Sequence, residues 1–400
     1  MASEPLGDAR TSTHGPIEEL TLGFPDADVE EMRRRLRNAR WPGDYANEDW
    51  YWGVERGWLQ EMAAYWADTF DLDAQLLEMN AYAQRRVVID DVPVHFTHVE
   101  GRGPDPLPLV LTHGWPWTFW DYRDVIGPLS DPGAHGGDPA DAFTLVIPSL
   151  PGYGFSSPLR VTGMSTTRVA QLWAVLMHDV LGYEQYAAAG GDWGGRVTGE
   201  LGIARPDRVV GIYLTLTLLP GVNRLTIPPE AWAEDEAWML ERADEALPLI
   251  LPHVIAHRND PQTLAYAMAD SPIGTGAYLW QRRRNWSDCD GDVVGLFGRD
   301  DLCTLASLYW LTDTMGTSMR FYRDNQEPGS TDRVEVPTGF GVAPRDNTFM
   351  PRSMAEERAN VQRWHVFPRG GHFAPAEIPE LVVDELRTFF RPLRPADQPR

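Results

Sequence analysis

The sequence contains no lysine, so all 35 basic residues in this chain of 400 are arginines. The absence of lysine excludes a phosphate-binding loop that ends in Lys-Ser/Thr, a lysine Schiff base and a Ser-Lys catalytic dyad. We attribute the excess of arginine to genome composition, and by itself it indicates no function.

Cysteine and long apolar stretches are scarce as well. Cys289 and Cys303 are too few for a disulfide framework and lack the spacing of metal ligands, which fits a reducing compartment. No run of about 18 apolar residues occurs, and Met1 to Gly15 lack the apolar stretch of a signal peptide. We therefore predict a cytoplasmic protein with no membrane partner and with a disordered tail over residues 1–16.

Acidic residues outnumber basic ones, which gives a net charge of −23. Because the acidic residues are scattered rather than clustered, we predict that neither nucleic acid nor an anionic membrane is a partner. The 400 residues suffice for two or three modules of about 100 to 200 residues with large cores. The composition leaves the oligomeric state open, a homodimer included.

The N-terminal residues 17–86 are predicted to form a helical meander rich in tryptophan. Asp26 to Asp28 are expected to cap an amphipathic helix that stops before Trp41-Pro42. The aromatic stretch Trp50 to Val54 precedes a second helix. Since no active-site motif lies near these tryptophans, we predict that they pack over the flank of the main domain.

Strands alternate with helices in residues 87–217. A hairpin is predicted around Asp91, and continuous apolar runs after it are typical of strands buried on both faces of a parallel sheet. This alternation indicates an α/β doubly wound sheet. The hairpin strands are Val87 to Asp90 and Val92 to His98; the apolar runs are Leu107 to Thr112, Phe143 to Pro148, Tyr186 to Ala189 and Val209 to Thr215; a helix spans Thr166 to Val180.

The pattern changes at about Leu218, where short helices rich in Pro, Trp and Glu replace the strand-like runs. We predict that residues 218–330 form a mainly helical lid over the carboxyl edge of the sheet, where ligands bind in such folds. The core is expected to resume in residues 331–400, with strands from Val334 to Phe340 and Gln362 to Phe367 and a last helix from Glu380 to Phe390.

The stretch Gly190 to Gly195 places Asp192 between small residues, at a junction that is strand before and helix after. Small neighbours permit the strained strand-to-helix turn that presents a nucleophile at the top of a sheet. A carboxylate is ionised at neutral pH and attacks carbon without a base, leaving an ester that water can cleave. The alternative is an aspartate that only bonds its own backbone in a Gly-rich turn.

Several motifs in one order resemble those of bacterial epoxide hydrolases of the microsomal type, which are α/β-hydrolases with an N-terminal meander and a helical lid. The resemblance covers nearly the whole chain. It implies the α/β-hydrolase fold and conversion of an epoxide to a vicinal diol by water, without a cofactor or a metal. The motifs are Arg40-Trp-Pro42, His113-Gly-Trp-Pro116, Ile147 to Ser156, Gly190-Gly-Asp-Trp-Gly194, Asp270-Ser-Pro272, Arg320-Phe-Tyr322, Pro337-Thr-Gly-Phe340 and Gly370-Gly-His-Phe373.

The resemblance implies a catalytic role for three residues in the chain order of this fold. Asp192 would be the nucleophile that forms an alkyl-enzyme ester, and His372 would activate water for hydrolysis of the ester. Asp346 matches the acid that orients the histidine; many relatives carry Glu there, and either carboxylate can hold the imidazole.

The resemblance also implies groups that stabilise developing negative charge. The backbone N–H groups of Trp115 and Trp193 would form the oxyanion hole during ester hydrolysis. Tyr322 matches one of the two lid tyrosines that protonate the alkoxide formed on ring opening. His113, although close to the oxyanion motif, has a structural role in this family.

The second lid tyrosine is replaced, because an ungapped count places His253 at its position. An imidazole there could donate a hydrogen bond, tuned by His257 one turn later. Alternatively Tyr322 acts alone, or Tyr266 turns inward. A histidine pair at this spacing could also bind a metal, but no third ligand is apparent.

Trp117 and Phe155 are predicted to line the substrate pocket. Relatives often have Gly at the position of Trp117, so a bulky ring there suggests an aromatic or polycyclic epoxide, such as a secondary metabolite. The sequence does not define the substrate or the stereochemistry.

Two other functions compete with the epoxide hydrolase hypothesis. Haloalkane and haloacid dehalogenases also combine Asp with His and an acid, but they need no lid phenol such as Tyr322. A non-catalytic binding protein on a hydrolase scaffold would usually lack a member of the triad, whereas all three are present here.

Overall fold

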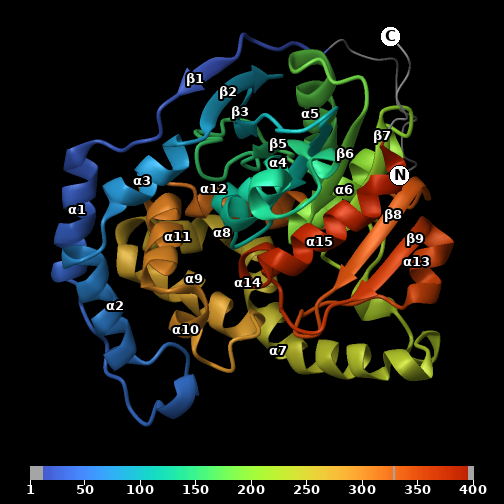
Figure 1. The fold of residues 1–400 in the computed structure, drawn as a ribbon. Helices are drawn as coiled ribbons and strands as arrows, with labels where there is room; N and C mark the ends of the chain where they lie inside the picture. The colour runs from blue at the N-terminus through green and yellow to red at the C-terminus, as the bar shows by residue number, and fades with distance from the viewer. Residues whose placement is uncertain (1–11, 328, 395–400) are drawn as a thin grey trace.

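The computed structural model describes residues 12–327 and 329–394 (Figure 1). Within these residues nine strands form one sheet in the order β1-β2-β3-β5-β4-β6-β7-β8-β9. The pairs β1–β2, β2–β3 and β3–β5 are antiparallel, and the remaining pairs are parallel. The strands are β1 (Glu18–Leu20), β2 (Ala83–Ile89), β3 (Val92–Val99), β4 (Leu107–Thr112), β5 (Phe143–Pro148), β6 (Tyr186–Gly190), β7 (Val209–Leu214), β8 (Val334–Val342) and β9 (Ala359–Val366).

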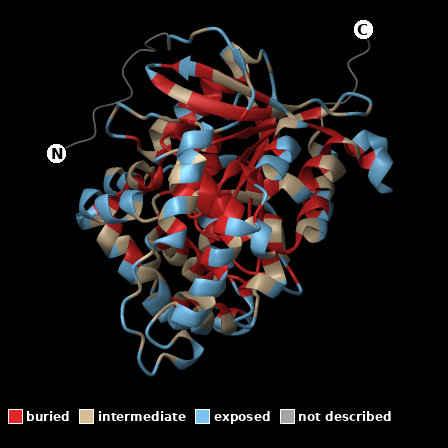
Figure 2. Cartoon of the chain, turned by 90° about the vertical axis from the view of Figure 1, so that its left-hand side faces the viewer, coloured by how far each residue is buried: buried red, intermediate tan, exposed pale blue. Residues whose placement is uncertain are grey.

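Helices cover both faces of the sheet, so its parallel strands are buried, as Figure 2 shows. Successive residues of a strand point to opposite faces. In β7, Ile212 faces Gly202 of α6, whereas Tyr213 packs against Phe389 of α15, with ring centroids 5.5 Å apart. The core helices are α4 (Arg123–Ser130), α5 (Thr166–Ala174), α6 (Asp192–Ala204), α13 (Arg352–Arg358), α14 (Ala374–Glu377) and α15 (Pro379–Phe390).

The helix predicted from Thr166 to Val180 is present, but it changes its winding along the way. The α-helical part, α5, ends at Ala174, and Val175–Val180 continues as a π-helix. The predicted strands of the core are confirmed, and those at β4 and β5 have the predicted limits.

The lid lies between β7 and β8 in the chain and is helical, as predicted (Figure 1). Proline opens two of its helices, since the first N–H groups of a helix need no intrahelical acceptor. The lid helices are α7 (Ala237–Asn259), α8 (Pro261–Asp270), α9 (Pro272–Trp286), α10 (Val293–Phe297), α11 (Arg299–Leu311) and α12 (Met315–Asp324).

Two helices of the N-terminal meander pack against the lid, whereas the third contacts strand β2 of the core. The meander comprises α1 (Asp26–Arg37), α2 (Arg56–Asp68) and α3 (Leu72–Asn80), and both α1 and α2 contact α9 and α11. The prediction that Trp50 to Val54 is a packing surface is wrong for two of its rings. Tyr51 and Trp52 are 76% and 72% exposed, because the packing is made by the helix that follows.

Two predicted details of the N-terminal region also differ. Asp26 and Asp28 lie in the first turn of α1 rather than at its cap, which is Pro25 without a side-chain hydrogen bond. Of the tail predicted over residues 1–16, residues 1–11 lie outside the described residues. Thr13 and Gly15 are ordered, because their N–H groups donate to the β2–β3 hairpin.

In the described part of the chain, none of the helices combines the length and the apolar character needed to cross a lipid bilayer.

Candidate active site

The turn between β6 and α6 holds Asp192 in a left-handed backbone conformation, with φ of 50°. Nearby atoms of the same chain leave no space for a side chain at two glycines. A Cβ atom on Gly194 would lie 1.9 Å from the carbonyl oxygen of Thr112, and one on Gly114 would lie 2.3 Å from the Cβ of Asp192. This strained turn at the carboxyl edge of the sheet is the one predicted for a nucleophile.

The loop after β4 supplies a hydrogen-bond donor to this carboxylate. The backbone N–H of Trp115 donates to Oδ1 of Asp192 at 2.7 Å. Trp193 is the second residue of α6, where a backbone N–H has no intrahelical acceptor. The Trp115 N–H thus contacts the predicted nucleophile, and the Trp193 N–H lies at the N-terminal end of α6.

The loop after β9 brings His372 between two carboxylates. Its Nδ1 is 2.8 Å from Oδ1 of Asp346, and its Nε2 is 3.5 Å from Oδ2 of Asp192. Burial lowers the pKa of His372, but the charges of Asp346 and Asp192 outweigh burial and raise the pKa to about 10. The three residues predicted as a triad are thus brought together, with His372 as an imidazolium at neutral pH.

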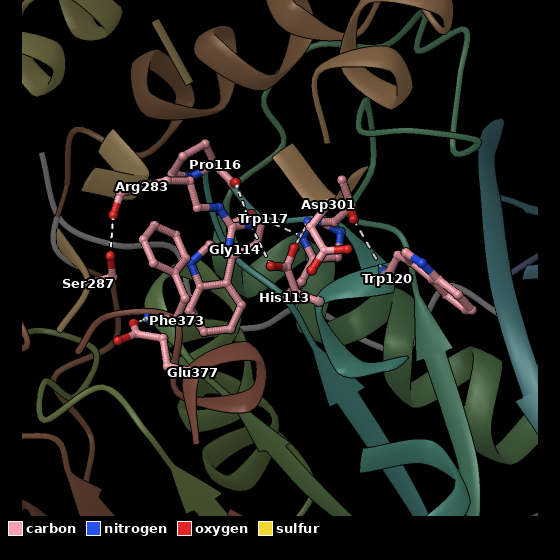
Figure 3. Close-up of polar contacts among 12 residues, drawn as sticks. His113, Gly114, Pro116, Trp117, Trp120, Arg283, Ser287, Asp301, Phe373 and Glu377 are labelled. Atoms are coloured by element: carbon pink, nitrogen blue, oxygen red, sulfur yellow. Dashed lines mark hydrogen bonds and ion pairs between the residues drawn. The ribbon is translucent and has the colours of Figure 1, made fainter. Parts of the chain in front are cut away.

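Glu377 holds the His372 loop in place, and the sequence analysis did not identify it. Its carboxylate accepts a hydrogen bond from the N–H of Phe373 at 2.7 Å (Figure 3). It also accepts from the N–H groups of Gly371 and Asp288, at 2.9 and 2.8 Å. Burial raises the pKa of Glu377 to about 7, against the effect of these bonds. A carboxylate five residues after the histidine is the only sequence signal for this role.

Arg283 of the lid holds the loop that carries the Trp115 donor. Its guanidinium donates to the carbonyl oxygen of Pro116 at 3.3 Å and pairs with Asp121, and its own carbonyl accepts from Ser287 (Figure 3). The lid is thereby fixed to the oxyanion loop. This contact joins segments far apart in the chain, so spacing could not predict it.

His113 has the structural role that the resemblance implies. Its Nε2 accepts from the N–H of Leu150 at 3.0 Å, so the proton is on Nδ1, which donates to the carbonyl oxygen of Gly114. Burial lowers the pKa of His113 to about 4, which keeps the ring neutral.

The lid places Tyr322 and His253 together over the oxyanion loop. The Tyr322 hydroxyl is 3.2 Å from Nε2 of His253, and the His253 ring stacks on Trp115 with centroids 5.1 Å apart. Burial, and then the charge of Asp192, raise the pKa of Tyr322 well above its usual value. Burial lowers the pKa of His253 well below its usual value. Both groups are therefore neutral at neutral pH.

The positions of Tyr266 and His257 bear on two of the alternatives considered for His253. Tyr266 is 71% exposed, so it does not turn inward. Nε2 of His257 is 3.0 Å from the Tyr278 hydroxyl, and neither of these residues lines the cavity beside Asp192. No group of three His, Cys, Asp or Glu side chains suited to a metal ion occurs among the residues that the structure describes.

A cavity of about 140 Å³ opens beside Asp192. Five of the predicted site residues line it, namely Asp192, Trp193, His253, Tyr322 and His372. Sequence reasoning missed the others, which are Arg196, Leu216, Leu218, Ile250, Val254, Arg258, Trp286, Asn347 and Thr348.

The prediction that Trp117 and Phe155 line this cavity is wrong. Trp117 is fully buried behind the triad, with its ring 5.7 Å from that of His372 and 5.6 Å from that of Phe373. Phe155 stacks on Phe24 of the meander, 5.7 Å away. Neither ring belongs to the lining of the cavity.

Comparison with known proteins agrees with this geometry. The profile described as "Epoxide hydrolase N terminus" matches residues 17–122, and that described as "alpha/beta hydrolase fold" matches residues 108–249. A putative epoxide hydrolase of Stigmatella aurantiaca is 35% identical over 94% of this chain and 86% of its own length. Epoxide hydrolase 1 of Sus scrofa is 28% identical over 93% of this chain and 88% of its own length.

Solved structures show the same fold. Juvenile hormone epoxide hydrolase of Bombyx mori superposes with a TM-score of 0.84 at 24% identity, covering 94% of this chain and 95% of the other. The Aspergillus niger epoxide hydrolase gives a TM-score of 0.83 at 24% identity, covering 95% and 97%. These relatives favour neither a dehalogenase nor a binding protein. The chain belongs to the epoxide hydrolase family, with an α/β-hydrolase core preceded by the N-terminal domain of that family, and it is an epoxide hydrolase.

Proposed function

We propose that this enzyme opens the epoxide in two steps, through a covalent ester on Asp192. The observation that carries the proposal is the position of His372, which contacts the predicted nucleophile with one nitrogen and Asp346 with the other. The protonation of His372 can then follow the charge of Asp192, and the same ring can activate water beside an ester on Asp192.

In the first step, a carboxylate oxygen of Asp192 forms a bond to one epoxide carbon while the bond from that carbon to the ring oxygen breaks. The ring oxygen becomes an alkoxide and takes a proton from the Tyr322 hydroxyl. If Nε2 of His253 carries the ring proton, it donates to the phenol oxygen, 3.2 Å away, and stabilises the phenolate as it forms. The neutral states of both groups support these roles.

In the second step, the charge lost from Asp192 prepares the base. The esterified residue no longer raises the pKa of His372, so the imidazolium gives up its proton, which restores the Tyr322 hydroxyl, and the neutral ring can then accept a proton from water. Hydroxide adds to the ester carbonyl, and the oxyanion is held by backbone N–H groups such as that of Trp115. The ester bond to the diol oxygen then breaks, that oxygen takes the proton of the added hydroxyl group, and the diol leaves. Asp192 returns to a carboxylate, and His372 keeps the proton that it took from water.

The bulky aromatic substrate suggested by Trp117 loses its support, since this ring lies behind the triad. The lining of the cavity, rather than Trp117, must select the substrate.

The His372→Gln variant tests the two-step route. We expect it to form the ester but not to hydrolyse it, so intact mass spectrometry after incubation with an epoxide panel will show protein heavier by the mass of the epoxide. Peptide mapping will place the adduct on Asp192, and Asp192→Asn will show none. A His372→Gln enzyme that releases diol without an adduct would contradict the covalent route.

A further inference from the structure

The cavity beside Asp192 has a charge opposite to that of the whole protein. Its lining contains two arginines, Arg196 and Arg258, against one aspartate, Asp192. The charge of His372, if counted, is matched by Asp346 behind it. Among the residues that line the cavity, positive charges thus outnumber negative ones by one, in a protein with a net charge of −23.

Arg258 reaches the cavity from the same face of α7 as His253. Ile250, His253, Val254 and Arg258 all line the cavity, and their spacing of three, one and four residues places them on one side of a helix. Arg258 therefore lies about one turn beyond the histidine that contacts Tyr322.

The Arg258 guanidinium has no protein counter-ion among the residues that the structure describes. Its Nε is buried and makes no hydrogen bond there, and it forms none of the ion pairs found in the described ranges. Two other lid arginines are satisfied: Arg283 pairs with Asp121, and Arg282 lies 3.6 Å from the ring of Tyr278. Because a partly buried cation without a partner costs free energy, a ligand is its natural counter-ion.

Arg196 adds a second positive charge near Arg258. It lies one turn after Asp192 on α6, with its guanidinium carbon 5.7 Å from the Trp193 ring. Burial lowers the pKa of Arg196, Asp192 raises it, and the charge of Arg258 lowers it, which shows that the two guanidinium groups repel each other. An anion bound at Arg258 would relieve this repulsion.

We infer that the substrate is an epoxide that carries a carboxylate, held by Arg258 and by the field of Arg196 while the epoxide carbons face Asp192. The inference rests on the proposed function of Asp192. Guanidinium pairs with a carboxylate through two parallel hydrogen bonds, which fix orientation as well as position. One carboxylate would balance the charge of Arg258, and the apolar side chains of Leu216, Leu218, Ile250 and Val254 accommodate the hydrocarbon part.

A pair of substrates that differ only in charge tests this inference. We would measure kcat/KM for an epoxy acid such as 3-phenylglycidate and for its methyl ester with wild type, Arg258→Gln and Arg258→Lys. Wild type is expected to prefer the acid by at least about tenfold, and Arg258→Gln to lose about 10- to 100-fold on the acid but less than about threefold on the ester, as for a hydrogen bond between charged groups. Arg258→Lys should recover part of the loss.

The control variant is Arg299→Gln, which removes a lid arginine that pairs with Glu61 outside the cavity. It should leave the preference unchanged, and melting curves will report whether each variant is folded. Equal use of acid and ester by wild type, or equal losses on both in folded Arg258→Gln, overturns the inference while leaving the epoxide chemistry intact. If neither substrate forms diol or an Asp192 ester, the proposed mechanism fails and the inference fails with it.

Discussion

Asp192 touches a hydrogen-bond donor and an ion-pair partner, and alkylation changes its relation to both. The N–H of Trp115 contacts the carboxylate at 2.7 Å, and in the proposed mechanism it would also serve the oxyanion. His372, 3.5 Å away, is held as an imidazolium by the carboxylate, and the proposed ester would release it as a base. In this proposal one change in charge on a single residue links the two steps, so that the base would be produced only when there is an ester to hydrolyse.

Substitution of His253 will separate proton donation from ester hydrolysis. His253→Gln should slow ester formation by about tenfold, because the Tyr322 phenolate loses a donor, whereas Tyr322→Phe should slow it by about 100-fold or more. Neither variant should change the rate of ester hydrolysis, which depends on His372. Stopped-flow tryptophan fluorescence under single-turnover conditions measures both rates.

Tyr266→Phe is the control for these variants, because Tyr266 lies on the lid but is exposed. Its rates should equal those of wild type. An equal loss in both steps for His253→Gln would mean that the ring only fills space above Trp115.

Because of Asp346, the protein is expected to lose stability as the pH rises from neutral to alkaline values. His372 has a pKa of about 10 when folded, above its usual 6.5, so its charged form contributes stability in full below pH 6.5 and loses it as pH rises through about 10. Asp346→Asn removes a carboxylate that raises this pKa. The difference in Tm between wild type and Asp346→Asn should therefore shrink between pH 7 and pH 10.

Differential scanning fluorimetry across this range measures the effect. Asp384→Asn, at an exposed position of α15, should differ from wild type by the same small amount at every pH. A constant Tm difference for Asp346→Asn would show that His372 is not charged in the folded enzyme.

At the scale of elements, the loop between β9 and α14 is built around one buried carboxylate. Glu377 accepts the N–H groups on both sides of His372, so its ionised state fixes the backbone that positions the ring. Its pKa of about 7 places the change of state near neutral pH. The loop that carries His372 is thereby sensitive to pH.

Glu377→Gln should lower kcat by about three- to tenfold, since one acceptor is replaced by a donor beside the loop. In wild type, kcat should rise with pH through about 7 as Glu377 ionises, and in the variant this rise should be absent. A kcat profile between pH 5.5 and 9 checks both. Glu380→Gln, an exposed position nearby, should keep the profile of wild type, and persistence of the rise in Glu377→Gln would assign it to another group.

The sheet was predictable from the sequence because each parallel strand is a local apolar run. Leu107–Thr112 and Phe143–Pro148 had the same limits in the structure. The start of α6 was harder to predict. Residues Asp192 to Gly195 contain glycines, which disfavour a helix, and only the close approach to Thr112 explains why glycines are needed there.

The grouping of Asp192, Asp346 and His372 was predictable through motifs, whereas the cavity was not. Motif order identified Asp192, Asp346 and His372 and placed His253 opposite them. The orientation of Arg258 depends on how α7 turns over the sheet, and two prolines interrupt the helical pattern that would have revealed its face. The prediction that Trp117 lines the pocket failed because the volume of a side chain at a motif position does not say which way its ring points.

At the scale of the whole molecule, the meander packs against the lid, and we call this contact the clamp. Trp58 and Trp66 pack edge-on against Trp280 of α9, with centroids 5.8 and 5.6 Å away. The lid in turn positions Tyr322 and His253. The N-terminal segment therefore supports the site from a distance, and no local pattern in the sequence could assign it to the lid instead of the core.

Trp66→Phe is expected to weaken this clamp. Trp66 is fully buried, and its Nε1 donates to Oγ of Ser307 on α11 at 2.8 Å. The variant leaves a void and an unsatisfied hydroxyl, which should lower the free energy of unfolding by about 1 to 3 kcal/mol. Denaturant unfolding followed by circular dichroism measures this loss, and limited proteolysis should show faster cleavage within the lid.

Trp52→Phe is the matched control, because the Trp52 ring is 72% exposed and should contribute less than about 0.5 kcal/mol. The readout that separates a clamp from ordinary core packing is the rate of ester formation, which depends on Tyr322. If the meander holds the lid, Trp66→Phe should slow ester formation by a few-fold at temperatures where the protein is still folded, while hydrolysis of the ester by His372 is unchanged. Equal effects on both rates, or a loss of stability without faster cleavage in the lid, would show that Trp66 stabilises the molecule as a whole and leaves the lid independent of the meander.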